Sequence, residues 1–367
     1  MNKDKIVERF INYAKISSPS YKEKKFGEVV YNDLKNLGAE IYFDDMSEKC
    51  GSDYGNLIAH IKGDLPGESL MFSAHLDTVS PCENIEPVID NDRIISSGNT
   101  ILSSDDKAGI TAIIEAIKYA KDNNIKHRDL EIVFTIGEEV GLLGSKNLDY
   151  SKINSKLCYV LDSDGHPGTV TVKSPAHANV SAEFIGLAKH AGLEPENGIS
   201  AIQMAAYAIN NLNLLRIDSE TSANVGTIHG GKADNIVADN CKVTFEIRSL
   251  DSNKLNIQLE KMLATIKETA DKFGGSVNIQ HEIEYDAVSI DLDSDVIKLF
   301  KNACSKCGFN FNPVSSGGGA DSSNFFGKGI QAVTVGVGMS QVHSTNEFIL
   351  IDDLVNSAKL VLALITE

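Results

Sequence analysis

The sequence lacks a long hydrophobic run. No stretch approaches the ~20 consecutive apolar residues that a membrane-spanning helix requires. The N-terminal segment, residues 1–8, also lacks the apolar core of a secretion signal. We therefore expect a cytoplasmic protein that has no membrane partner.

Positive charge is scarce as well. The chain has 34 Lys and Arg residues against 51 Asp and Glu residues, which gives a net charge of -17. A surface of this charge repels nucleic-acid phosphates and anionic lipid head groups. Nucleic acid is therefore excluded as a partner, and we expect a small substrate instead.

Cysteine is sparse and scattered, with six residues in a chain of 367. This usage excludes a small disulfide-stapled fold and indicates reduced thiols. Cys304 and Cys307 form the one C-x-x-C motif in the sequence, within an amphipathic stretch that predicts a helix. Because no second C-x-x-C completes a zinc site, we interpret both cysteines as helix-packing thiols.

The chain also lacks internal repeats, low-complexity segments and Pro-rich linkers, yet its length exceeds one ordinary hydrophobic core. Strand-like and helix-like patterns alternate through residues 1–173 and resume from 286, which is typical of a doubly wound sheet. In residues 174–285 the predicted strands and helices follow one another in a different pattern, which is typical of an α+β domain. The predicted fold is therefore α/β, with a doubly wound mixed-sheet domain (1–173 and 286–367) interrupted by a smaller α+β domain (174–285).

Two acidic residues follow the predicted strand 131–136. Glu138 and Glu139 lie just beyond its end, on a turn flanked by glycines. Ligands of open α/β sheets gather at the carboxyl ends of the strands, so this position favours a functional role. Neighbouring carboxylates also need a counter-charge when they are buried. A metal ion would supply that charge, although a solvated acidic loop would have the same local sequence.

His75 follows another predicted strand, 69–74, and Asp77 comes two residues later. This spacing is typical of a metal-binding imidazole and the carboxylate that orients it. A structural histidine of the core would fit the same pattern, so the pair alone does not decide between the two interpretations.

Three further residues occupy comparable positions. Asp105 starts a predicted helix, where an N-cap is the alternative interpretation, and Asp162 and His343 follow buried strands. Together the candidate metal ligands are His75, Asp105, Glu139, Asp162 and His343. Five nitrogen and oxygen ligands suffice for two zinc ions if one carboxylate bridges them.

Six motifs, read together, carry a family resemblance. They are Ala74-His75-Leu76-Asp77-Thr78, Ser104-Asp105-Asp106-Lys107-Ala108-Gly109, Gly137-Glu138-Glu139-Val140-Gly141, Leu161-Asp162, Gly317-Gly318-Gly319-Ala320-Asp321 and His343-Ser344-Thr345-Asn346-Glu347-Phe348. In this order they resemble the dinuclear-zinc exopeptidases typified by peptidase T. That family also contains zinc aminoacylases and succinyl-diaminopimelate desuccinylases.

The resemblance implies two zinc ions per chain, with Co²⁺ or Mn²⁺ as substitutes. One ion would bind His75, Asp105 and Asp162. The other would bind Asp105, Glu139 and His343, so that Asp105 bridges the pair.

The resemblance also implies how the reaction would run. Asp77 would orient His75, and Glu138 would be the general base for attack by a zinc-bound hydroxide. The peptide bond between Asp105 and Asp106 is expected to be cis.

By the same resemblance, the domain at 174–285 is a lid that carries the contact of a homodimer. His190 would stabilise the oxyanion, commonly from the partner subunit, and Asn235 and Arg248 would bind the substrate. Structural roles for Asn235 and Arg248, and an ordinary surface position for His190, fit the sequence as well.

We therefore expect an intracellular exopeptidase, most simply an aminopeptidase, that cleaves a terminal amide bond of short peptides. Tripeptide-cleaving peptidase T typically has an Arg where this chain has Gly317, so the sequence leaves the peptide length open. The alternatives are an amidohydrolase of N-acyl or N-carbamoyl amino acids and, from another class, a catalytically silent metal-binding dimer that serves as an interaction protein.

Overall fold

The computed structural model describes residues 1–44 and 47–367, and the chain divides into two units. Unit 1 contains Met1–Val172, Ser289–Ser316 and Ala320–Glu367, and unit 2 contains Lys173–Val288 and Gly317–Gly319. The predicted fold class, an α/β mixed sheet interrupted by a smaller α+β unit, is confirmed.

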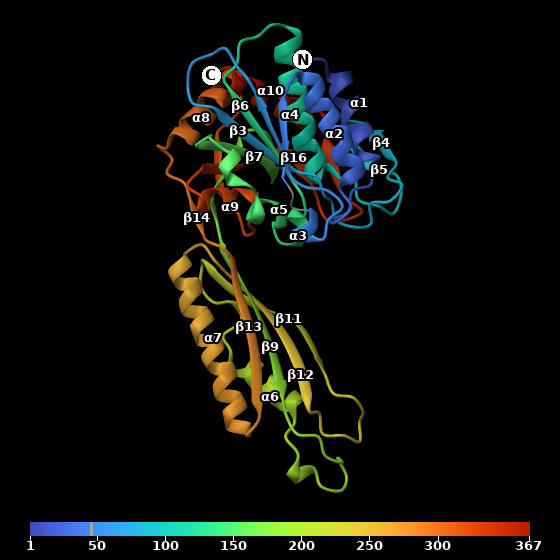
Figure 1. Ribbon diagram of the computed structural model, residues 1–367, viewed down its shortest axis with the longest axis vertical. Coiled ribbons are helices and arrows are strands. Elements are labelled where there is room, and N and C mark those ends of the chain that lie inside the picture. The colour runs from blue at the N-terminus through green and yellow to red at the C-terminus, as the bar shows by residue number, and fades with distance from the viewer. Residues whose placement is uncertain (45–46) are drawn as a thin grey trace. The chain divides into compact units, whose positions relative to one another are not determined.

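Unit 1 is built on a 12-stranded sheet (Figure 1). Its strands are β1 (Glu40–Phe43), β2 (Leu57–Ile61), β3 (Leu70–His75), β4 (Pro87–Asp90), β5 (Arg93–Ser96), β6 (Leu130–Thr135), β7 (Leu157–Asp164), β8 (Thr169–Ser174), β14 (Val288–Ser289), β15 (Asn312–Ser315), β16 (Gln331–Ser340) and β17 (Phe348–Leu350). The main path runs β1-β2-β6-β3-β7-β16-β17-β5-β4, and β8 pairs with β14, β15 and β16. The central strands β6, β3, β7 and β16 are parallel and buried, as expected for apolar runs covered on both faces.

Helices cover both faces of this sheet. They are α1 (Lys3–Ala14), α2 (Lys24–Leu37), α3 (Ser47–Cys50), α4 (Ser104–Asp122), α5 (Leu143–Asn147), α8 (Asp295–Cys307), α9 (Asp321–Gly327) and α10 (Ile351–Ile365), with 3₁₀ turns η1 (Glu138–Val140) and η2 (Tyr150–Lys152). On one face α4 contacts α1, α2 and α10, and Phe300 of α8 stacks on Tyr159 of β7. On the other face Phe325 of α9 packs with Met71 and Val160. Because side chains alternate along a strand, these two clusters lie on opposite sides.

Parts of unit 1 differ from the sequence expectations. The hairpin β4–β5 and its partner β17 have no predicted counterpart, because these short antiparallel strands at the edge are only partly buried and lack a long apolar run. The apolar residues of 20–37 recur at helical spacing and predict a helix with Ser20 as its N-cap, but α2 starts at Lys24. Ser20 is not its N-cap, since the Ser20 hydroxyl donates to Asp77 at 2.7 Å.

Unit 2 is a five-stranded antiparallel sheet with helices on one face. Its elements are β9 (Ala176–Ile185), η3 (Pro195–Asn197), α6 (Ala201–Asn211), β10 (Leu215–Arg216), β11 (Thr221–Gly230), β12 (Asn240–Ser249), α7 (Ser252–Phe273) and β13 (Ser276–Tyr285). The sheet order is β10-β11-β12-β9-β13. Val180 and Phe184 of β9 face the core with α6 and α7, whereas His177 and Asn179 point to the opposite, polar face.

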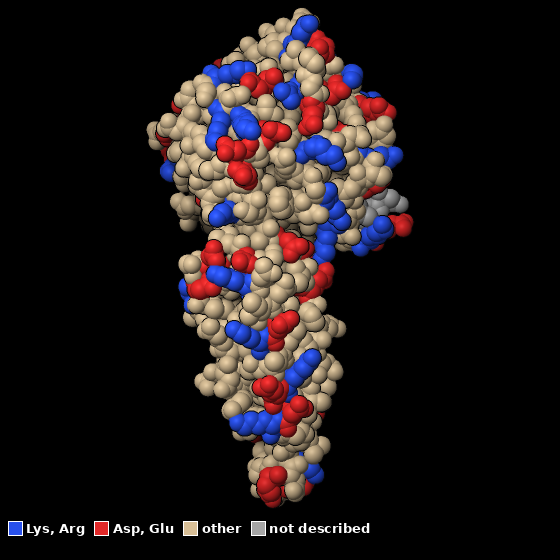
Figure 2. Space-filling model, turned by 90° about the vertical axis from the view of Figure 1, so that its left-hand side faces the viewer, with Lys and Arg blue, Asp and Glu red and all other residues tan. Residues whose placement is uncertain are grey.

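Acidic and basic side chains are mixed over the face shown in Figure 2. Within residues 1–44 and 47–367, the helices are all too short or too polar to cross a membrane.

Candidate metal centre

Side chains with metal-binding chemistry meet at one edge of the unit 1 sheet. His75 is the last residue of β3, and Asp162 lies near the end of β7, parallel to β3. Glu139 belongs to η1, which follows β6, while Asp105 lies in the first turn of α4 and His343 follows β16. The carboxyl ends of parallel strands are where α/β sheets bind ligands, and the structure brings all five residues there.

The turn that carries Glu138 and Glu139 is formed by two flanking glycines and by hydrogen bonds to Asp77. Gly137 and Gly141 flank η1 with φ of 58° and 106°, in the left-handed region that glycine enters most readily. The Asp77 carboxylate then accepts hydrogen bonds from the backbone N–H groups of Glu138 at 2.9 Å and Glu139 at 3.2 Å. Asp77 thus caps the start of the turn and fixes the direction in which it points.

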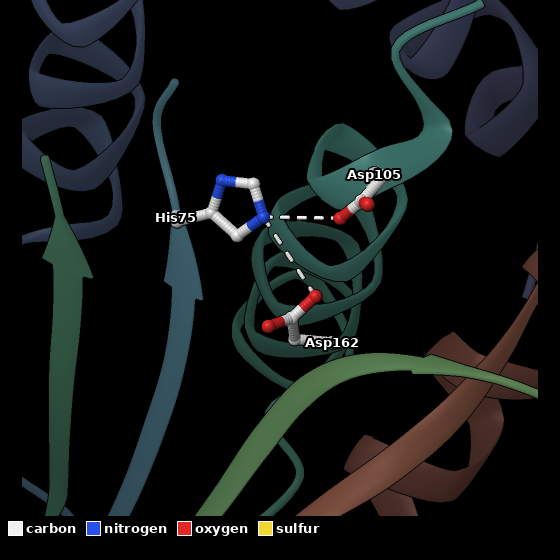
Figure 3. Close-up of side chains that lie close together, drawn as sticks. All are labelled: His75, Asp105 and Asp162. Atoms are coloured by element: carbon white, nitrogen blue, oxygen red, sulfur yellow. Dashed lines mark hydrogen bonds and ion pairs between the residues drawn. The ribbon is translucent and has the colours of Figure 1, made fainter. Parts of the chain in front are cut away.

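The first group of candidate ligands surrounds the buried ring of His75. Its Nε2 lies 3.0 Å from Oδ1 of Asp105 and 3.7 Å from Oδ1 of Asp162, and all three side chains point toward one another in Figure 3. On the far side of the ring, Nδ1 is 2.8 Å from the backbone oxygen of Asp77 and 3.5 Å from its carboxylate. The Asp77 carbonyl therefore holds the ring so that Nε2 faces the carboxylates.

The second group forms around His343. Its Nε2 lies 3.2 Å from Oδ2 of Asp105 and 3.0 Å from Oε2 of Glu139. The two oxygens of Asp105 therefore face different histidines, which is the arrangement that a bridging carboxylate needs. Ligand atoms of each group lie within 4.8 Å of one another, and Glu138 forms a further group with His75 and Glu139.

Burial and charge shift the pKa values in this cluster. Burial raises the pKa of Asp162 to about 7. Burial also raises the pKa of Glu138 well above its usual value, and the Asp162 carboxylate adds to that shift. Hydrogen bonds to Asp105 and Glu139 raise the pKa of His343 to about 10. Asp162, Glu138 and His343 therefore favour their protonated forms, because they are buried or lie beside other carboxylates of the cluster.

The residues present fit a divalent metal ion. Oε1 of Glu139 is buried and has no hydrogen-bond partner among the described residues, so this oxygen is available as a ligand. Imidazole nitrogen and carboxylate oxygen are ligands that zinc accepts, and manganese also takes carboxylates. The peptide bond between Asp105 and Asp106 is cis, as the resemblance implies.

The model of peptidase family M20/M25/M40 matches residues 71–367. The chain belongs to this family. The chain is therefore a metal-dependent peptidase, and the matched residues span the whole cluster of candidate ligands.

Several relatives of this M20 peptidase match it from end to end. The protein YqjE of Bacillus subtilis (strain 168), whose function is uncharacterised, is 39% identical over 100% of this chain and 99% of its own. The solved structure of aminopeptidase PepT from Bacillus cereus ATCC 10987 is 38% identical with a TM-score of 0.93, covering 100% of this chain and 98% of that one. A tripeptidase structure from Staphylococcus aureus subsp. aureus mu50 is 32% identical with a TM-score of 0.96, with the same coverage.

The three remaining candidates of the M20 peptidase, His190, Asn235 and Arg248, lie in unit 2. His190 is exposed, and its Nδ1 accepts a hydrogen bond from the Gly192 N–H at 3.1 Å. In a neutral imidazole this leaves Nε2–H as the donor. The backbone oxygen of Asn235 accepts from the Ala191 N–H at 3.0 Å, which ties the two segments together.

Arg248 lies on the polar face of the unit 2 sheet. Its Nη2 and Nε are 3.3 and 3.4 Å from Glu246, which also lies 3.4 Å from Nε2 of His177. These are long contacts for a guanidinium, so Glu246 holds Arg248 only loosely.

Three further residues shape the M20 peptidase centre although the sequence analysis gave them no role there. Ser20 donates to Asp77, Glu23 accepts the Gly137 N–H at 3.1 Å, and Glu347 binds the loop that precedes Asp105. Each acts over a long sequence separation, so local patterns gave no signal for Ser20 or Glu23. Glu347 could have been found, because it lies within the motif that starts at His343.

Proposed function

We propose that this protein is a dinuclear-zinc aminopeptidase of short peptides. The observation that carries this proposal is the position of Asp105, whose two oxygens face His75 and His343 separately. One zinc ion would be held by His75, Asp105 and Asp162, and the other by Asp105, Glu139 and His343.

When bound, the metal ions would lower the pKa of a water molecule and polarise the scissile carbonyl. Glu138 would take the proton from that water and give it to the leaving nitrogen, acting as one base and acid for both half-steps. Its place beside Glu139, outside the two groups that share Asp105, supports this assignment. Asp77 would hold His75 through its carbonyl and the glutamates through its carboxylate.

Two similarities support peptide amides as the substrate. The B. cereus structure at 38% identity is described as an aminopeptidase, and the S. aureus structure at 32% identity as a tripeptidase. Arg248 would bind the carboxylate of such a peptide, which suits its planar guanidinium. His190 would donate from Nε2 to the oxyanion, and unit 2 would form the contact of a homodimer.

The test is a substrate panel on the zinc-loaded protein. Dipeptides and tripeptides with free amino termini, the same peptides with acetylated amino termini, and N-acetyl and N-carbamoyl amino acids are assayed side by side. We expect cleavage of the free peptides alone, and its loss after chelation and recovery with zinc. Cleavage of only the N-acyl or N-carbamoyl amino acids would assign an amidohydrolase instead.

A further inference from the structure

Glu347 is a buried carboxylate to which the mechanism above gives no role. Its side chain is only 2% exposed, although it lies in the turn between β16 and β17. A charged group is retained at such a position only when hydrogen bonds replace its water. The partners of Glu347 therefore indicate what it does.

Both oxygens of Glu347 bind the loop that leads into α4. Oε2 accepts the backbone N–H groups of Leu102 at 2.7 Å and Ser103 at 3.0 Å. Oε1 accepts from the Ser104 hydroxyl at 2.5 Å and from the N–H of Asp105 at 3.1 Å. One side chain thus binds four consecutive residues. The last of them is Asp105, whose carboxylate belongs to both groups of candidate ligands.

The backbone of this loop is not helical where α4 begins. Ser103 lies in the left-handed region, with φ 65° and ψ 31°, and its side chain does not cap the helix. Asp105 is non-helical, with φ -84° and ψ 100°. The orphan N–H groups at a helix start need acceptors, and the carboxylate of Glu347 supplies them from outside the helix.

Glu347 also belongs to the segment that carries His343. Its own N–H donates to the Ser344 oxygen at 3.2 Å, and the Ser344 hydroxyl donates to the Gln341 oxygen at 2.7 Å. His343 and Glu347 therefore hold Asp105 from one short turn, His343 at the carboxylate and Glu347 at the N–H.

We propose that Glu347 is a positioning residue of the metal centre, which fixes the carboxylate of Asp105 relative to His343 before any metal binds. This inference rests on the proposed metal site. Partners that orient a metal ligand typically change metal affinity or activity by ~10- to 100-fold when they are removed. We expect an effect of that size, larger for the ion held by His343, because Glu347 contacts two of the three segments that carry its ligands, those of Asp105 and His343.

The test is Glu347→Gln. Glutamine keeps the size of the side chain but turns one acceptor oxygen into an NH₂ donor, which must face N–H donors of the loop. Metal-free protein is titrated with Zn²⁺ in competition with a chromophoric chelator. We expect zinc to bind Glu347→Gln ~10- to 100-fold more weakly than wild type.

Glu131→Gln is the matched control. Glu131 is 3% exposed and accepts the N–H groups of Asn154 and Ser155, but it lies near the start of β6, away from the ligands. This variant should keep the zinc affinity of the wild type. The melting temperature of the metal-free protein is recorded for both variants, so that a general loss of stability is measured separately.

The outcomes separate the two proposals. Wild-type protein that binds no zinc refutes the proposed function, and the role of Glu347 with it. Wild-type binding together with equal zinc affinity in Glu347→Gln and Glu131→Gln overturns the role of Glu347 alone. If Glu347→Gln does not fold, Ser104→Ala decides, because it removes a single donor: weaker zinc binding supports the positioning role and unchanged binding overturns it.

Discussion

At the scale of single residues, Glu138 and Glu139 are neighbours with different surroundings. Glu139 lies 3.0 Å from His343 and has a buried oxygen without a hydrogen-bond partner in the described chain. Glu138 shares a group only with His75 and Glu139, not with Asp105. The geometry therefore favours Glu139 as a ligand and Glu138 as the residue that moves protons.

Separate substitutions test this difference. Glu138→Ala should lower kcat by ~10²-fold or more and keep its metal content, because a general base contributes to the chemical step. Glu139→Ala should lose metal as well as activity. Metal content is measured by elemental analysis and kcat with a short peptide. Equal metal loss in the two variants would show that the roles are assigned wrongly.

At the scale of elements, the centre depends on how closely α4 approaches β7. A Cβ atom at Gly109 would lie 2.3 Å from the backbone oxygen of Leu161 and 2.5 Å from Oδ1 of Asp106. Asp105 starts this helix and Asp162 follows Leu161, so the missing side chain of Gly109 is what allows the two carboxylates to meet. A methyl group added at position 109 should therefore push the carboxylates of Asp105 and Asp162 apart.

Gly109→Ala is therefore expected to lower the free energy of unfolding by ~1–3 kcal/mol, as overpacking does, and to weaken metal binding. Gly327→Ala is the control, since a Cβ at Gly327 has no atom within 4 Å. That variant should stay within ~0.5 kcal/mol of wild type. Urea unfolding of the metal-free proteins and zinc titration measure the two effects. Wild-type stability and affinity in Gly109→Ala would contradict the close-approach argument.

At the scale of the whole molecule, the proposed homodimer would let two chains share one catalytic centre. His190 belongs to unit 2 and offers Nε2–H as a donor, whereas the candidate metal ligands belong to unit 1. A symmetric dimer would let the His190 of each chain serve the centre of its partner. Loss of one oxyanion donor typically lowers kcat by ~10²- to 10³-fold.

His190→Ala should accordingly be nearly inactive and keep its zinc. After subunit exchange with Glu138→Ala, which is also inactive, heterodimers would contain one complete centre, and activity should return. The mixture is assayed against each variant alone, and exchange is verified by mass spectrometry with differently labelled chains. Verified exchange without activity would place His190 in the centre of its own chain or outside the reaction.

The sequence by itself determined the α/β class and predicted candidate ligands that the fold brings together at one edge of the sheet. Apolar β-branched runs such as 131–136 mark buried strands, and His75, Glu138 and Asp162 follow or end such runs. Strand ends are local features, so their chemistry can be read along the chain. The order of the motifs along the chain resembles that of a peptidase family, and the family model confirms that the chain belongs to it.

Only the tertiary structure decided how these residues are held. The pairing of β17 with β5, the bonds from Asp77 to η1 and the four bonds of Glu347 join segments that are distant in sequence. Hydrophobic periodicity reports which face of an element is buried, but it does not report which carboxylate will meet which N–H group. Those contacts form only when packing has fixed the backbone, and they orient the ligands that the sequence could merely name.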